Sequence, residues 1–220
     1  MERPTPTRSV HAQDDALPKA RIRPYRPTDR DALYAVALAT GHHGADASGL
    51  YRDTSLLGHR YVGPYLDLEP HLAFTLEDDQ GTCGYVLGAA DTTVFYARFT
   101  SEWLPLLLAR LGPAPAAPGD ADERLVAELH APTLTVPRDL EAYPAHLHID
   151  LLPRAQGRGY GRRMMDVVLE ALVRREARGV HLGLSPRNRR ARGFYGALGF
   201  HEVESARPDA GTLLMARRLP

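Results

Sequence analysis

Residues 156–161 read Gln156-Gly157-Arg158-Gly159-Tyr160-Gly161 and lie between an expected strand and an expected helix. Glycine lets the backbone come close to a bound ligand, because it has no Cβ atom. The first N–H groups of a helix have no partner inside the helix, and the helix dipole is positive there. A glycine-rich turn that opens a helix is therefore suited to binding an anion such as a pyrophosphate.

The spacing of these glycines argues against two common nucleotide sites. A dinucleotide fingerprint reads G-x-G-x-x-G, whereas here the glycines fall at 157, 159 and 161, and position 162 is Arg. A phosphate loop for ATP needs G-K-[ST], which this segment lacks. We therefore expect no tight binding of NAD or ATP.

Around this turn the chain alternates between strand and helix patterns. The expected elements are a strand at 145–152, a helix at 159–178, a strand at 180–184, a helix at 189–198, and strands at 200–204 and 212–216. Gly179 is expected to end the first helix in a left-handed conformation. Strand, helix, strand, helix, strand is typical of an α/β layer.

The first half of the chain predicts the remaining elements. They are a strand at 21–25, helices at 33–40 and 53–64, strands at 71–77 and 82–90 joined by a hairpin turn at 78–81, and helices at 103–111 and 122–129. Residues 1–19 lack periodicity and predict a flexible tail. The Pro-, Ala- and Gly-rich segment near 112–121 predicts an exposed insertion. The expected organisation is one domain over 20–220.

Composition excludes several classes of protein. The 220 residues suffice for one sizeable α/β domain, and the 27 basic and 27 acidic side chains balance. We therefore expect neither a nucleic-acid partner nor a membrane partner. Cys83 is the single cysteine, which excludes an internal disulfide and a cysteine-based zinc site; we expect no metal. No apolar stretch approaches a membrane span or a signal peptide, so the cytoplasm is the expected compartment.

Two blocks of sequence together resemble one enzyme superfamily. The turn matches Q/R-x-x-G-x-G/A, and Asn188, Ala191, Tyr195 and Gly199-Phe200 match N-x-x-A-x-x-x-Y-x-x-x-G-F. In this order and spacing they resemble the GNAT acetyltransferases. The resemblance implies a mixed, twisted sheet of about seven strands with helices on both faces. It also implies acetyl-CoA (coenzyme A) as cofactor and transfer of its acetyl group to a primary amine of a small molecule or peptide.

The resemblance also implies roles for individual residues. The implied cofactor-binding positions are Leu151, Leu152, Gln156, Gly157, Arg158, Gly159, Tyr160, Gly161, Arg162, Asn188, Ala191 and Tyr195. Backbone groups near Leu151 and Leu152 would pair with the pantetheine arm as an added strand does, and one N–H would polarise the thioester carbonyl. Tyr195 would protonate the departing sulfur, although an aromatic residue at this helical spacing can also serve packing alone.

The general base has three candidates. His146, His148 and Asp150 share one face of the expected strand by alternation, and Asp150 is nearest to the expected thioester position. A purely structural carboxylate is the alternative for Asp150. His148 and Asp46 are the other two candidates, the latter because its loop should border the acceptor cleft.

Three segments of the N-terminal half, at 44–48, 57–66 and 77–88, resemble the C-terminal acetyltransferase-like domain of protein O-GlcNAcase. With the C-terminal blocks, this similarity covers roughly residues 21–204. It implies a stand-alone protein of bacterial type without the sugar-hydrolysing domain, for which the chain is too short. It also keeps a second function open, a catalytically silent module that binds acetyl-CoA or a protein. The expected state is a monomer or a homodimer.

Overall fold

The computed structural model describes residues 20–203 and 211–220, so the predicted tail at 1–19 lies outside them. These residues form a seven-stranded sheet in the order β1-β2-β3-β4-β5-β7-β6. The strands are β1 (Arg21–Pro24), β2 (Ala73–Asp78), β3 (Gly81–Ala89), β4 (Ala145–Leu151), β5 (Gly179–Leu184), β6 (His201–Val203) and β7 (Leu213–Arg218). Every neighbouring pair is antiparallel except β4 and β5, which are parallel. The predicted mixed sheet is confirmed.

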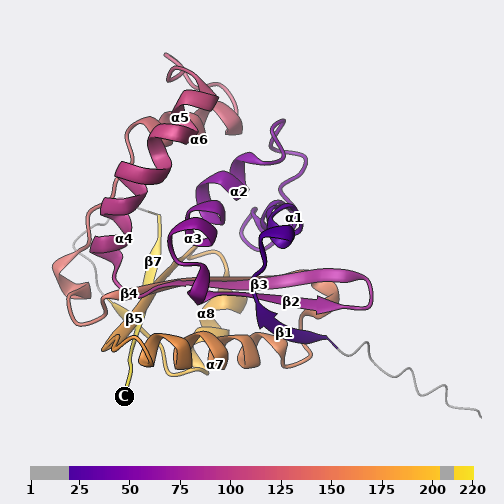
Figure 1. Cartoon of the computed structure of the whole chain (residues 1–220), viewed down its shortest axis with the longest axis vertical. Helices are drawn as coiled ribbons and strands as arrows, with labels where there is room; N and C mark the ends of the chain where they lie inside the picture. The colour runs from indigo at the N-terminus through magenta and orange to yellow at the C-terminus, as the bar shows by residue number, and fades with distance from the viewer. Residues whose placement is uncertain (1–19, 204–210) are drawn as a thin grey trace, which may run out of the picture.

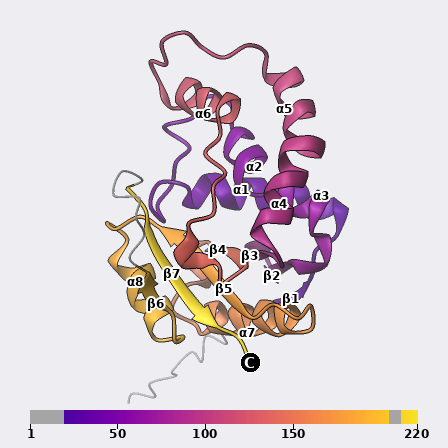
Figure 2. The same cartoon turned by 90° about the vertical axis from the view of Figure 1, so that its left-hand side faces the viewer.

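Helices cover both faces of the sheet (Figure 1). One face carries α1 (Arg30–Thr40), α2 (Leu56–Tyr61), α3 (Gly63–Leu68), α4 (Thr92–Arg98), α5 (Leu104–Leu111) and α6 (Ala121–His130). The other carries α7 (Tyr160–Val173) and α8 (Arg189–Gly196). Short 3-10 turns lie at Pro27–Asp29, Pro70–Leu72, Arg138–Leu140 and Pro153–Ala155. The residues from Gly112 to Asp120 form the connection between α5 and α6 and contain neither helix nor strand (Figure 2).

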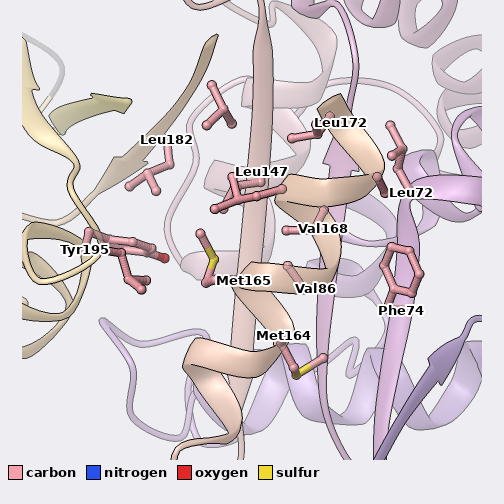
Figure 3. Close-up of a cluster of buried hydrophobic side chains, with 14 of the residues drawn as sticks. Leu72, Phe74, Val86, Leu147, Met164, Met165, Val168, Leu172, Leu182 and Tyr195 are labelled. Carbon is pink, nitrogen blue, oxygen red and sulfur yellow. The ribbon is translucent and has the colours of Figure 1, made fainter. Parts of the chain in front are cut away.

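Strand alternation divides the buried side chains into two cores. Val86 and Leu147 pack with Met165 and Val168 of α7 on one face (Figure 3). Tyr85 and Leu87, their neighbours on β3, pack on the opposite face among the helices from α1 to α6. Successive side chains of a strand point to opposite faces, so each central strand serves both cores at once.

The parallel contact between β4 and β5 is short. It joins Ala145 to Val180 and His146 to His181, and no pairing follows, although both strands continue. The Leu152 N–H donates to the Cys83 carbonyl at 2.8 Å, so backbone groups at alternate positions back to His148 also face β3. The backbone groups of Ile149 and Leu151 therefore face the gap that opens between the diverging strands.

Two of the predicted helices differ from the structure. The helix expected over 53–64 is two helices, because Val62 leaves the helical conformation with φ of −121°. The helix expected to begin at 103 is the end of a longer helical run that starts at Thr92, where Asp91 accepts from the Val94 N–H at 3.0 Å. A π-helical turn at Phe99–Trp103 joins α4 to α5.

The prediction for Gly179 was wrong. Helix α7 ends at Val173, and Gly179 is the first residue of β5. The left-handed residue after α7 is Glu176, with φ of 62°. Glycine is required at 179 for a different reason, since a Cβ there would lie 2.5 Å from the Ala142 carbonyl oxygen.

We expect Gly58→Ala to destabilise the fold. A Cβ at position 58 would lie 2.2 Å from the ring of Tyr34, which is buried, so the substitution overpacks the contact between α1 and α2. Overpacking of this kind typically costs about 1–3 kcal/mol. Urea unfolding measures the difference. Gly49→Ala is the matched control, because nothing lies within 4 Å of a Cβ there; equal stability of the two variants would contradict the prediction.

Candidate functional site

The glycine turn between β4 and α7 has the conformation that glycine permits. Gly157 and Gly159 have φ of 74° and 78°, and Gly159 is the N-cap of α7. No side chain caps this helix, and nothing lies within 4 Å of a Cβ built on either glycine. The turn therefore leaves room beside the uncapped start of α7, at the positive end of the helix dipole, which suits an anionic group.

An ion pair braces this turn from behind. The Arg154 Nε donates to Asp78 Oδ2 at 2.9 Å, and the guanidinium also donates to the Thr82 carbonyl at 3.1 Å. Arg154 lies in the 3-10 turn just before Gln156, whereas Asp78 and Thr82 belong to β2 and β3. The turn is thus tied to the hairpin at the end of the sheet.

A cleft of about 700 Å³ opens beside the turn at the gap between β4 and β5. Its lining comes from both faces of the sheet: Thr40, His43, Gly44, Ala45, Ile149, Asp150, Leu151, Gln156, Gly157, Gly159, Gly161, Arg162, Asn188, Arg190, Ala191, Phe194, Tyr195 and Ala197. Thr40 ends α1 on one face, while Gly161 and Tyr195 belong to α7 and α8 on the other. The cleft therefore connects the two faces where the strands diverge.

Nine of the twelve residues expected to bind a cofactor line this cleft, and Leu152, Arg158 and Tyr160 do not. The Leu152 N–H is used by β3. Arg158 is exposed on the turn, and the Tyr160 hydroxyl accepts from the Ala20 N–H at 3.0 Å. Of the two leucines expected to offer backbone groups, only Leu151 faces the gap.

Side-chain amides organise the cleft wall. The Gln156 Nε2 donates to the Leu151 carbonyl at 2.7 Å, and the Gln156 Oε1 accepts from Arg190 at 2.5 Å. The Asn188 Oδ1 caps α8 by accepting from the Ala191 N–H at 3.0 Å. These bonds connect the end of β4 with the start of α8 across the gap.

Asp150 is the acidic residue in the cleft lining. Its Oδ2 accepts from the Tyr85 hydroxyl at 2.6 Å. Burial raises the pKa of Asp150 to about 6, while hydrogen bonds from Tyr85 and Thr40 oppose that rise. A carboxylate with this pKa is ionised near pH 7 and is still basic enough to accept a proton.

Tyr195 lines the cleft from α8. Its ring is buried and packs against Phe194 and Phe200, with centroid distances of 5.2 and 5.7 Å. The hydroxyl end points toward β4 (Figure 3) and makes no hydrogen bond within the described part of the chain. Burial, and then the charge of Asp150, raise the pKa of Tyr195, so the hydroxyl keeps its proton throughout the neutral range.

The other two base candidates lie outside the cleft lining. His148 packs against the rings of Tyr65 and Tyr61, and burial followed by the charge of Arg60 lowers its pKa to about 4. Asp46 is exposed, and its Oδ1 accepts from the Ser48 N–H at 2.8 Å, which lowers its pKa. Only Asp150 among the three candidates combines access to the cleft with a pKa near neutrality.

Thr40, Tyr85 and the turn at 42–45 were not anticipated. Tyr85 lies opposite Asp150 in the β3–β4 register. The contact between Tyr85 and Asp150 follows from the register of β3 on β4, which the sequence alone does not give. His43 and Gly44 both have positive φ values. The 42–45 turn lies close to Asn188, because a Cβ built on Gly44 would be 3.3 Å from the Asn188 Nδ2.

Within residues 20–203 and 211–220, the helices lack the combination of length and apolar character that a membrane span requires. The same residues contain no group of three or more potential metal ligands among their histidine, cysteine, aspartate and glutamate side chains.

Comparisons with known proteins agree with this architecture. Residues 126–200 match the model of the acetyltransferase (GNAT) family. The crystal structure of SsHAT is 44% identical, covers 91% of this chain and 98% of its own, and superposes with a TM-score of 0.83. A structure of yncA from Salmonella typhimurium with its cofactor acetyl-CoA has the same fold at 13% identity, with a TM-score of 0.54 and 91% and 94% of the two chains covered.

The curated relatives include protein O-GlcNAcase of Rattus norvegicus, which is 26% identical over 204 residues. The alignment covers 90% of this chain but 21% of that protein, so the chain spans about a fifth of its relative's length. The similarity expected from the N-terminal segments is thereby confirmed. Given the family model and the 44% identity to SsHAT over nearly the whole of both chains, this chain belongs to the GNAT acetyltransferase family.

Proposed function

We propose that the protein transfers the acetyl group of acetyl-CoA to a primary amine on a small molecule or peptide. The observation that carries this proposal is the cleft itself. Asp150 and Tyr195 line it together with the glycine turn, so a base, an acid and an anion site share one continuous space.

Acetyl-CoA is the cofactor of this family, and it supplies an activated acetyl thioester. The residues present fit it. The left-handed glycines at 157 and 159 leave the start of α7 open to a pyrophosphate. The Leu151 N–H faces the gap in the sheet, where it can pair with an extended pantetheine arm and donate to a thioester carbonyl.

Asp150 is the proposed general base. An alkylamine has a reference pKa near 10.4, so only roughly one molecule in 2,500 is neutral at pH 7. The ionised Asp150 carboxylate attracts the ammonium form and takes one proton from it, leaving a neutral amine and a protonated carboxyl. The amine would approach from the α1 face, on which Asp150 and Thr40 lie.

Tyr195 is the proposed proton donor to the departing sulfur. Its raised pKa makes it a weaker acid than an exposed tyrosine, because both burial and Asp150 disfavour the phenolate. The hydroxyl therefore acts first as a hydrogen-bond donor to the developing thiolate. Protonation of Asp150 by the amine removes the neighbouring negative charge and so eases the later loss of the Tyr195 proton to the sulfur. The second amine proton, released when the C–S bond breaks and the amide forms, returns Tyr195 to its protonated state.

The alternative is a silent module that binds acetyl-CoA without transfer. It is favoured by the 26% identity to a fifth of protein O-GlcNAcase, a relative whose name describes no acetyl transfer. A screen of primary amines, with detection of the free thiol of CoA, discriminates between the two functions. Acceptor-dependent thiol release supports transfer, and acetyl-CoA binding without release for any amine supports the module.

Gly159→Asp should abolish acetyl-CoA binding. The substitution adds bulk and negative charge where the pyrophosphate is expected, and it forces a non-glycine residue to a φ of 78°. Isothermal titration calorimetry measures binding. Gly193→Asp on α8 is the matched control, because it makes the same change at an exposed position that does not line the cleft. Wild-type affinity in Gly159→Asp would overturn the assignment of the turn.

Tyr195→Phe should reduce kcat at least tenfold while leaving the Kd for acetyl-CoA nearly unchanged. The variant keeps the buried ring and removes only the hydroxyl, and a general acid typically contributes about 10²- to 10⁴-fold. Steady-state kinetics with an acceptor from the screen test this. Turnover at the wild-type rate would reduce Tyr195 to a packing residue.

Asp150→Asn should stabilise the protein, and more so at high pH. Because the folded pKa of Asp150 is about 6, above its unfolded value near 3.9, stability falls as pH rises between these values. Asparagine removes this loss, so the gain should grow from near zero at pH 4 to on the order of 1–3 kcal/mol at pH 8. We expect the lower part of that range, because the side chain is only partly buried.

Urea unfolding at pH 4, 6 and 8 measures that gain. Asp79→Asn, which removes a carboxylate from the exposed β2–β3 turn, controls for the general effect of charge. A stability difference between Asp150→Asn and the wild type that does not change with pH would contradict a raised pKa for Asp150.

A further inference from the structure

Thr40 is the polar residue of α1 that lines the cleft beside Asp150. It is buried, with 4% of its surface exposed, at the last position of the helix. Its hydroxyl donates to the Val36 carbonyl at 2.8 Å. The same hydroxyl is close enough to Asp150 to lower the pKa of that carboxyl. Within residues 20–203 and 211–220, no backbone N–H donates to the Asp150 carboxylate.

A hydroxyl carries one proton and two lone pairs, so it cannot donate to both neighbours at once. When Asp150 is ionised, rotation about the Thr40 side chain turns the hydroxyl proton from Val36 to the carboxylate. The Val36 carbonyl keeps its helical N–H bond in that state. When Asp150 is protonated, its own O–H can donate to the Thr40 oxygen, while the Thr40 proton returns to Val36.

Tyr85 differs from Thr40 in this respect. Its hydroxyl donates to Asp150 Oδ2 at 2.6 Å, and Tyr85 is fully buried. Its proton has no second acceptor in the part of the chain that the structure describes. Burial raises its pKa well above the ordinary value, and the residue stays protonated. Tyr85 therefore holds one carboxylate oxygen in both charge states, and the other oxygen is left to gain or lose the proton.

We infer that Thr40 is a positioning residue for Asp150: its hydroxyl donates to the carboxylate in the ionised state and accepts from the carboxyl in the protonated state. This inference rests on the proposed role of Asp150 as the base. In the transfer step the ammonium proton moves to Asp150 Oδ1, the carboxylate oxygen that Tyr85 does not hold, and the Thr40 proton moves only by rotation. Each polar atom has a partner before and after, so neither charge state is left with an unsatisfied buried group.

Other groups around Asp150 do not replace Thr40. Tyr85 of β3 and Tyr195 of α8 stay protonated, since burial raises the pKa of both. His148, two positions along the same face of β4, is neutral because burial lowers its pKa to about 4. The remaining charged or titratable residues of the cleft lining are His43 in the 42–45 turn, Arg162 of α7 and Arg190 of α8.

The test is the titration of Asp150 followed by the ¹³C resonance of its carboxyl carbon, assigned from the signal lost in Asp150→Asn. Thr40→Val keeps the shape of the side chain and removes the hydroxyl. The pKa should rise by about half a unit to one unit, because a charged acceptor gains more from a hydrogen bond than a neutral one does. Thr40→Ser restores the hydroxyl and should restore the wild-type titration. An unchanged or lowered pKa in Thr40→Val, or the same rise in Thr40→Ser, would overturn the inference.

Thr100→Val is the matched control, since the Thr100 hydroxyl donates to the Tyr96 carbonyl at 2.8 Å with the same four-residue spacing on an exposed helix. It should leave the titration of Asp150 unchanged. If Thr40→Val does not fold, Thr40→Ala takes its place with the same expected rise.

This titration needs no acceptor, so it is independent of whether the protein transfers acetyl groups. When an acceptor is known, the acidic limb of the kcat/KM profile should move with the titration in Thr40→Val. If Thr40→Val changes the pKa of Asp150 but leaves the acidic limb of the kcat/KM profile unchanged, Thr40 remains the partner of Asp150 and Asp150 is rejected as the base.

Discussion

The divergence of β4 from β5 is the constraint on which the site depends. Parallel strands normally satisfy each other's backbone groups along their length. Here the pairing stops after His146 and His181, so the N–H and C=O groups of Ile149 and Leu151 have no partner strand. Because buried backbone groups are nearly always paired, a gap of this kind must be filled by side chains, water or a ligand. Gln156 fills part of it by donating to Leu151, and an extended pantetheine arm is suited to the rest.

The same divergence explains why residues from opposite faces can meet. Side chains on β4 alternate between the α7 core and the helices from α1 to α6, and a continuous sheet would keep the two sets apart. At the gap, Asp150 from one face and Tyr195 of α8 from the other line a single cleft. In the proposed transfer, a cofactor bound along α7 and an acceptor on the α1 side would reach each other only where the sheet is open.

Local patterns predicted the C-terminal half well because its elements obey local rules. The apolar spacing in α7 and the glycine turn before it identified the sheet layer and the turn that lines the cleft, and the seven-stranded mixed sheet followed from the family resemblance. The boundaries that failed depended on tertiary contacts. Gly179 was expected to end a helix, whereas in the structure position 179 requires glycine because Ala142 and Tyr143 pack against it. Tyr85 and Thr40 could not be assigned to Asp150, because the register of β3 on β4 and the docking of α1 are not encoded by any nearby pattern.

His146, His148 and Asp150 lie on one face of β4, and their different roles follow from where each lies along the strand as it diverges from β5. Residue type alone does not predict those roles. His146 lies where β4 and β5 still pair. The Thr92 hydroxyl donates to the Pro144 carbonyl, so His146 Nδ1–H must donate to Thr92, and Tyr65 donates to Nε2. Both ring nitrogens are used, and the ring is a neutral structural element.

His148, one step along, has lost the β5 partner but is still covered by tyrosine rings. Asp150 lies two residues further, where the gap is wide enough to form a cleft. His146 is buried, whereas His148 and Asp150 are half-buried, and Asp150 alone of the three lines the cleft. The last polar residue before the glycine turn can therefore keep a perturbed pKa and still meet a substrate. A carboxylate moved two residues toward His148 would be covered, and one placed beyond the end of β4 would be solvated to an ordinary pKa.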